Sequence, residues 1–185
     1  MSLPSTNQLL QSRAILVRPL AALDSSNEAL TVFLAGSTTS QEQPDWRTRL
    51  SSAIADLPVT IFDPKNSAWD STWKESFKDE RWTAQHRWEM RAREDADVVV
   101  FCFEAGTDAP ISLLELGLTF GCRHRSSRVV MFAAKDYSRR AYVESVSQGR
   151  GVATHDDEGE FVAEVRAAIH SASRAKFGYD IEKHA

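Results

Sequence analysis

The sequence predicts one α/β domain built on a doubly wound sheet of about five mostly parallel strands, with helices on both faces. Two observations lead to this fold class. Short apolar runs of strand length alternate with longer stretches whose apolar residues recur at helical spacing, the order that parallel sheets require. The chain has 185 residues, 42% of them apolar, which is the length and composition of a single compact domain.

The two ends of the chain are expected to lie outside this domain. Residues 1–28 begin with a polar, aperiodic stretch and continue into AILVRPLAAL, a short edge strand that Pro19 would interrupt. The domain is expected to span residues 29–172, and residues 173–185 to form a C-terminal tail.

The first half of the domain predicts two strands and two helices. ALTVFLAG (29–36) is the first core strand, and VTIF (59–62) is a second, which Asp63-Pro64 stops. A loop or small lid is expected over residues 65–78, which are too polar for a core element, and a helix over 81–94. Between the strands, an amphipathic helix is indicated by apolar residues at steps of four, four and three, namely Trp46, Leu50, Ile54 and Leu57.

The second half repeats the alternation. VVVFCF (98–103) reads as a buried strand, and a helix begins near Pro110. RVVMFAA (128–134) follows as a strand, with a possible last strand in GVATH (151–155). Short and long helices are expected over 138–148 and 156–177.

The helix after Pro110 is apolar on more than one face. We expect its inward stripe to be Ile111, Leu114, Leu118 and Gly121, with Gly117 and Gly121 allowing a close approach to the sheet. Three apolar side chains are then left facing outward, namely Leu113, Leu116 and Phe120. An exposed stripe of that kind favours pairing with a second copy of the chain, although the long loop or the last helix could cover it instead.

Composition excludes several classes of protein. The 22 Lys and Arg against 26 Asp and Glu give a net charge of −4, which disfavours a nucleic-acid polymer as partner. Cys102 and Cys122 lack metal-site or redox spacing and are expected to be reduced, packed thiols. The five histidines are scattered, so we expect no metal and no cofactor. No apolar run suits a membrane span, and a cytoplasmic location is the expectation.

Ligands of open α/β sheets bind beyond the carboxyl ends of the strands. Three segments reach that edge here: the turn 36–39, the loop 63–78 and the loop 104–112. Gly36 and Ser37 offer backbone amides and a hydroxyl to an anion or a sugar, although an ordinary strand-to-helix turn would have the same composition. Asp63, which opens the second segment, is a further substrate-binding candidate.

Glu115 is the main catalytic candidate. On its helix it falls at the border of the inward stripe, beside Ser112, where a carboxylate is partly desolvated. Asp108 precedes the helix and Asp97 the strand, so acidic groups could gather for acid and nucleophile chemistry at a glycosidic bond. Position alone disfavours Asp97, which precedes its strand, and leaves open a rim role for Glu115 and a capping role for Asp108.

Two tryptophans in the polar loop could contact a ligand. Trp69 and Trp73 flank Asp70, and an aromatic face stacked on a nucleobase contributes ~1 to 3 kcal/mol. Packing within a lid explains the pair equally well.

An ordered set of motifs resembles one known family. VFLAGS (32–37), Asp45-Trp46, the DP and WDSTW of 63–73, QHRWEM (85–90), ADVVVF (96–101) and PISLLELG (110–117) occur in this order. Together they are similar to the nucleoside 2-deoxyribosyltransferase-like family, with the resemblance running from Val32 to Tyr142. It implies a Rossmann-like fold, cleavage or transfer at the N-glycosidic bond of a (deoxy)nucleoside, and a neighbouring subunit that completes each site.

The resemblance also assigns roles. Glu115 matches the catalytic glutamate, Gly36-Ser37 the turn at the 5′ end of the substrate, and Asp97 an aspartate near the sugar. Asp108 matches a loop that holds a second acidic residue. The expected mechanism is attack by Glu115 on C1′, with Asp97 or Asp108 assisting the leaving base, and a second base or water resolving the intermediate.

The chain also departs from the family. Asp63-Pro64-Lys65-Asn66 stands where close relatives often have Asn-Pro-Arg-Arg, and the turn after Gly36 lacks the arginine and glycines that hold a 5′-phosphate. A free nucleoside is therefore the expected substrate, with a free base as second partner. A hydrolase that uses water and a non-catalytic nucleotide-binding module are the alternatives.

Overall fold

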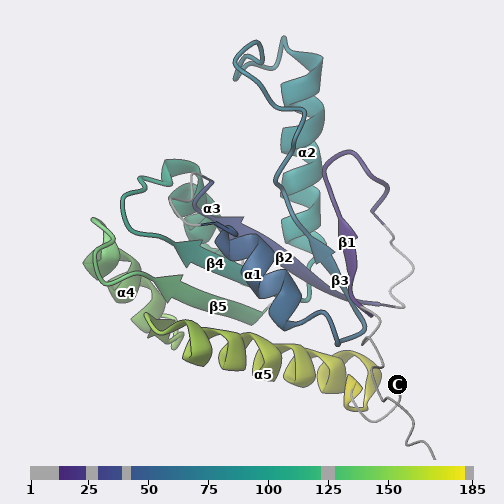
Figure 1. The fold of residues 1–185 in the computed structure, drawn as a ribbon, viewed down its shortest axis with the longest axis vertical. Helices are drawn as coiled ribbons and strands as arrows, with labels where there is room; N and C mark the ends of the chain where they lie inside the picture. The colour runs from purple at the N-terminus through teal and green to yellow at the C-terminus, as the bar shows by residue number, and fades with distance from the viewer. Residues whose placement is uncertain (1–12, 24–28, 39–42, 122–127, 182–185) are drawn as a thin grey trace, which may run out of the picture.

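The computed structural model describes residues 13–23, 29–38, 43–121 and 128–181. Within these ranges the chain forms one all-parallel sheet in the order β1-β3-β2-β4-β5-β6, which confirms the doubly wound α/β class (Figure 1). The strands are β1 (Ile15–Val17), β2 (Leu30–Gly36), β3 (Val59–Phe62), β4 (Val98–Phe103), β5 (Arg128–Ala133) and β6 (Thr154–His155).

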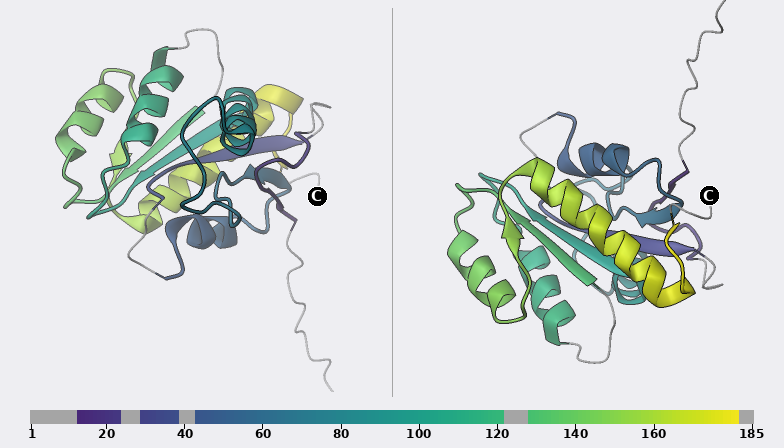
Figure 2. Two further views of the ribbon diagram at one scale, coloured as in Figure 1. Left: turned by 90° about the horizontal axis from the view of Figure 1, so that it is seen from above. Right: turned by 90° about the horizontal axis from the view of Figure 1, so that it is seen from below.

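Helices cover both faces of the sheet (Figure 2). Helices α1 (Trp46–Ala53) and α5 (Glu158–Phe177) pack on one face, in a core that includes Leu50 and Val165. The other face carries α2 (Glu80–Asp95), α3 (Pro110–Gly121) and α4 (Arg140–Gln148), in a core that includes Trp88, Leu116 and Val143.

Strand β2 contributes side chains to the hydrophobic cores on both faces of the sheet. Val32 and Leu34 belong to the core under α1 and α5, whereas Phe33 and Ala35 belong to the opposite one. Successive side chains of a strand point to opposite faces, so a strand buried on both sides must be a continuous apolar run. This requirement explains the unbroken apolar sequence of β4 as well, all six residues of which are buried.

Two features at the ends of the domain refine the expected boundaries. Strand β1 pairs with β3 at the edge of the sheet, with Ile15 opposite Thr60. Helix α5 continues to Phe177 and ends at Gly178, whose left-handed φ of 79° is a common helix stop, so the boundary at residue 172 falls inside this helix.

The inward face predicted for α3 was wrong. Ile111, Leu114 and Leu118 are exposed, by 60%, 61% and 43%, whereas Leu116 is buried against the sheet. Ser112 fixes this orientation, because its Oγ donates a hydrogen bond of 3.0 Å to the carbonyl of Gly36. Gly117 and Gly121 lie outward and make no close approach, since a Cβ at either position would meet no atom within 4 Å.

The remaining sequence expectations have simple outcomes. Cys102 is a buried free thiol, while Cys122 lies outside the described residues. None of the helices in the described ranges has the length and apolar content needed to cross a membrane.

Candidate active site

A pocket of about 440 Å³ opens at the carboxyl end of β2. The chain passes from β2 outward to β3 and then returns to β4 on the other side of β2, so this is the point where the strand order reverses and where such folds place their ligands. The pocket lies between the turn after β2, the loop after β3, and helices α2 and α3, and its lining includes Gly36, Trp69, Ser112 and Glu115. The structure thus brings four of the predicted site residues together.

Gly36 allows the chain to turn at the floor of the pocket. Its φ is +137°, and a Cβ there would lie 2.1 Å from the carbonyl oxygen of Cys102. Only glycine fits both the conformation and the space. The next amide, Ser37 N–H, donates to that same Cys102 carbonyl at 2.9 Å, which holds the turn against β4.

Ser37 supports the turn rather than lining the pocket. Its side chain is buried, with Oγ 2.6 Å from Thr107 Oγ1 and accepting the N–H of Glu104 at 3.0 Å. Both contacts tie the end of β2 to the loop after β4. The hydroxyl predicted to meet substrate is therefore already engaged within the protein.

Asp63 also acts behind the pocket. It is buried, and its carboxylate lies 3.6 Å from Arg47 Nε and accepts the amide N–H of Lys65 at 3.0 Å. Arg47 lines the pocket and donates to the carbonyls of Ser37 at 2.6 Å and Gly36 at 3.1 Å. Burial lowers the pKa of Arg47, and the nearby charge of Asp63 opposes that effect. Asp63 thus stabilises a buried cation that shapes the turn.

Glu115 presents a largely buried carboxyl group to the pocket. Only 16% of its side chain is exposed, and Oε1 lies 3.5 Å from Nη1 of Arg93, a buried arginine of α2. Burial is the main reason why its pKa rises from 4.5 to about 7; Arg93 opposes this shift and the charge of Glu89 adds to it. A carboxyl that changes charge near neutrality within a cleft is a strong candidate for catalysis.

A second carboxyl, which the sequence analysis did not single out, lies in the same pocket. Glu89 of α2 is partly buried, and burial raises its pKa as well. Its Oε1 accepts a hydrogen bond of 2.7 Å from Nε2 of Gln85, one helical turn earlier, and Asn66 bonds Gln85 in turn. The motif QHRWEM contains both Gln85 and Glu89 and is the signal in the sequence that could have identified them.

The two tryptophans of the loop differ in position. Trp69 lines the pocket and remains 56% exposed, so its ring is available to a ligand. Trp73 is not among the lining residues; the guanidinium of Arg81 lies over its ring, 5.2 Å from the centroid. The pair is thus divided between the pocket and the packing of the loop.

Asp97 lies at the opposite end of the sheet from Glu115. It precedes β4, and Cys102 at the pocket end lies five residue steps further along, or roughly 16 Å along the strand. Its Oδ2 accepts hydrogen bonds of 2.9 Å each from Thr31 N, Thr31 Oγ1 and Lys176 Nζ. These contacts fasten α5 and β2 to β4.

Asp108 is also separate from the pocket. Its side chain is 79% exposed and forms an ion pair of 3.0 Å with Arg139 at the start of α4. Neither aspartate is thus brought together with Glu115, and the carboxyl that accompanies it is Glu89.

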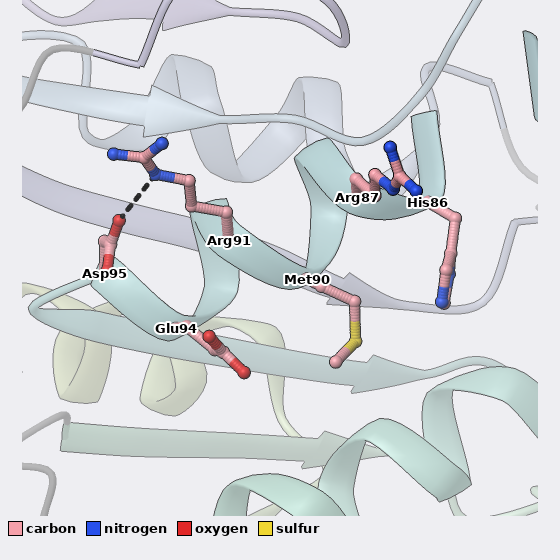
Figure 3. Close-up of a pocket in the computed structure, with 6 residues that line it drawn as sticks. All are labelled: His86, Arg87, Met90, Arg91, Glu94 and Asp95. Carbon is pink, nitrogen blue, oxygen red and sulfur yellow. Dashed lines mark hydrogen bonds and ion pairs between the residues drawn. The ribbon is translucent and has the colours of Figure 1, made fainter. Parts of the chain in front are cut away.

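A wider groove of about 580 Å³ runs along α2 but is built differently (Figure 3). All its lining residues come from that single helix, and Arg91 turns to Asp95 at 3.4 Å. In Figure 3, Met90 and Glu94 extend to the opposite side of the helix from Arg87 and Arg91. Because the side chains diverge, we do not regard this groove as the active site. Within the described ranges, no group of three or more His, Cys, Asp or Glu side chains could hold a metal ion.

A comparison with known families identifies the family of the chain. A family model described as "Nucleoside 2-deoxyribosyltransferase like" matches residues 29–137, more than half of the chain. The chain belongs to this family. No functionally curated protein gives a significant match.

The part of the chain matched by the nucleoside 2-deoxyribosyltransferase-like family contains the whole pocket, from Ala35 to Glu115. Strand β1 and helix α5 lie outside it. Membership indicates a function of the nucleoside 2-deoxyribosyltransferase type and a nucleoside as the class of substrate.

Proposed function

We propose that this protein cleaves or transfers the base at the N-glycosidic bond of a (deoxy)nucleoside, with Glu115 as the nucleophile. The observation that carries the proposal is the largely buried carboxyl of Glu115, 3.5 Å from Arg93, in a pocket that also contains Glu89 and Trp69. Two carboxyl groups of different surroundings in one cleft are what acid and nucleophile chemistry at an anomeric carbon needs.

The surroundings of the two carboxyls support separate roles. Burial raises the pKa of both carboxyls, that of Glu115 to about 7. At Glu115 the cation of Arg93 lies within ion-pair distance and opposes this rise, which favours the carboxylate needed for attack. Glu89 is bonded instead to the neutral amide of Gln85, so its protonated form, which burial favours, is available for the acid step. We therefore assign the attack to Glu115 and the donation of a proton to Glu89, in place of Asp97 and Asp108.

The reaction proceeds in two displacements. An oxygen of the Glu115 carboxylate forms a bond to C1′ while the C1′–N bond breaks, its electron pair staying on the base nitrogen as Glu89 delivers a proton to the base. An incoming base or water then attacks C1′, the bond to Glu115 breaks, and the proton of the acceptor returns to Glu89. Two inversions retain the configuration at C1′.

The lining of the pocket supports a free nucleoside rather than a 5′-phosphorylated one. Arg47 already donates to the carbonyls of Gly36 and Ser37, and Lys65 is in an ion pair with Asp45. A phosphate would have to displace these partners. Trp69, at the mouth, offers an aromatic face to the base.

Incubation with a panel of deoxyribonucleosides and ribonucleosides, with and without a second free base, tests the proposal. Chromatography is expected to show a new nucleoside when an acceptor base is present. Release of base without an acceptor would instead support the hydrolase. Binding without any turnover would contradict the proposed chemistry and favour a nucleoside-binding module.

A further inference from the structure

We propose that Gln85 is a positioning residue for the acid step, held by Asn66 so that the acidic proton of Glu89 is confined to Oε2. This inference rests on the proposed function and deepens it, because it states from which oxygen the base is protonated. The three side chains all line the pocket and form a hydrogen-bond relay, which we call the amide relay: Asn66 to Gln85 to Glu89.

The direction of the amide relay is fixed at its loop end by the backbone. The amide of Ala68 can only donate, and it bonds Oδ1 of Asn66 at 2.9 Å. The oxygen of this side chain therefore faces the backbone, and Nδ2 faces Gln85. Nδ2 donates to Oε1 of Gln85 at 2.6 Å.

The backbone carbonyl of Pro64 fixes the orientation of Gln85, which is the part of the relay on the helix. Gln85 receives the Asn66 N–H on Oε1, so its Nε2 is turned the other way, where it meets two acceptors. One is Oε1 of Glu89 at 2.7 Å, and the other is the carbonyl of Pro64 at 3.4 Å, which can only accept. Turning the Gln85 amide over would place oxygen against oxygen at both contacts, so only one orientation satisfies the relay.

The consequence falls on Glu89. Its Oε1 accepts an N–H from Gln85, and a proton on the same oxygen would point at that N–H or displace it. The proton of the neutral acid is therefore placed on Oε2, which has no partner in the relay. When Oε2 gives up its proton to the departing base, the hydrogen bond from Gln85 remains and stabilises the new carboxylate.

A purely structural role would predict something else. Asn66 belongs to the loop after β3 and Gln85 to α2, so the relay could simply fasten the loop to the helix. In that case Asn66→Ala would change the stability or the affinity for nucleoside but leave the pKa of Glu89 where it is, because Gln85 would still donate to Glu89. The pKa of Glu89 in Asn66→Ala is thus the quantity that separates the two roles.

The first experiment needs no turnover. The carboxyl carbon of Glu89, assigned with Glu89→Gln, is followed by NMR through a pH titration in the wild type, Gln85→Met and Asn66→Ala. Because a donated N–H favours the ionised form, Gln85→Met is expected to raise the pKa of Glu89. Asn66→Ala, which removes only the hydrogen bond that holds Gln85, is expected to raise the pKa of Glu89 less. The matched control is Arg87→Gln, on the exposed surface of α2, which should leave it unchanged.

The second experiment measures the reaction. Gln85→Met is expected to lower kcat by at least about tenfold, with little change in KM, and to move the alkaline limb of the rate profile to higher pH. An unchanged pKa of Glu89 in Asn66→Ala would overturn the inference, even if the activity of this variant fell. A wild type without activity on any nucleoside would overturn the proposed function, while the titration would still decide whether the relay controls Glu89.

Discussion

The surroundings of a single residue, Glu115, set the expected pH dependence of the protein. Burial raises the pKa of its carboxyl from 4.5 to about 7. The nucleophile must be ionised, so kcat/KM for a nucleoside is expected to fall about tenfold per pH unit once the pH is well below 7. A profile that stays flat down to pH 5 would contradict ionised Glu115 as the attacking group.

The same shift affects stability. A carboxyl whose pKa is raised in the folded state favours folding at pH values below 4.5, and this contribution is lost as the pH rises through about 7. Glu115→Gln cannot titrate, so it is expected to flatten the dependence of the unfolding free energy on pH in this window by up to about 3 kcal/mol. Urea denaturation at pH 4.5 and pH 8 measures this. If the unfolding free energy changed equally between the two pH values in the wild type and in Glu115→Gln, Glu115 would not be a buried carboxyl that titrates in this range.

The two loop tryptophans form a matched pair for a binding test. Trp69→Ala is expected to raise KM for the nucleoside roughly tenfold with a smaller effect on kcat, because stacking of ~1 to 3 kcal/mol holds ground and transition states alike. Trp73→Ala, which removes a ring under Arg81 outside the pocket, should leave KM nearly unchanged. If the two variants changed KM equally, the base would bind somewhere other than against Trp69.

Individual site residues were predictable where the backbone decides the position. Gly36 and Ser112 follow from the end of a strand and the first turn of a helix. Glu89 could not be found in this way, because a carboxylate on a helix whose apolar residues suggest packing looks like a solvated surface group. Its approach to Glu115 depends on how α2 and α3 lie against the sheet, which no spacing along the chain records.

At the scale of elements, the turn at Gly36, where β2 ends, shapes one side of the pocket. Gly36→Ala would place a Cβ 2.1 Å from the Cys102 carbonyl at a φ of +137°, so it is expected to destabilise the fold by at least about 2 kcal/mol. Gly117→Ala on the exposed face of α3 is the control; it meets no atom within 4 Å and should stabilise by up to about 1 kcal/mol. Thermal unfolding of both compares them, and similar melting temperatures would contradict the role of Gly36.

Helix α3 shows why its existence was predictable but its rotation was not. Six of the ten residues from Ile111 to Phe120 are large and apolar and lie on more than one side of the helix, so the periodicity offers more than one inward face. The hydrogen bond of Ser112 to Gly36 and the packing of Leu116 select one of them. Glu115 borders the buried face all the same, because it lies next to Ser112 and Thr119 on the helix surface.

At the scale of the whole molecule, the exposed side of α3 is expected to join two copies of the chain. Ile111, Leu114 and Leu118 form an apolar stripe without charges, which a two-fold axis could pair with itself. Ile111 also lines the pocket, so a partner on this stripe would adjoin the substrate. Light scattering at micromolar concentration is expected to give twice the 20.7 kDa of one chain.

Two substitutions separate this interface from the core. Leu114→Glu is expected to yield a folded monomer, whereas Leu116→Glu buries a charge against the sheet and should prevent folding. A 20.7 kDa particle for the wild type would refute the dimer. If Leu114→Glu is still a dimer, the two copies must contact each other through another surface.

The overall architecture was the most predictable level. Apolar runs of the kind seen in β4 are typical of strands buried on both faces, and their alternation with helices along the chain indicates a parallel sheet covered on both sides. The edge strands β1 and β6 were foreseen only as short possibilities, because their few residues carry little pattern.

The central claim is that the glycosyl group passes through a covalent bond to Glu115. A nucleoside with fluorine at C2′ slows resolution of such an intermediate, since the substituent disfavours the oxocarbenium-like transition state. The protein is incubated with this analogue without an acceptor base, quenched, digested and measured by mass spectrometry. We expect one glycosyl group on the peptide that contains Glu115, and none on Glu115→Gln. Release of base from a natural nucleoside with no adduct, or an adduct on another carboxyl, would contradict the account.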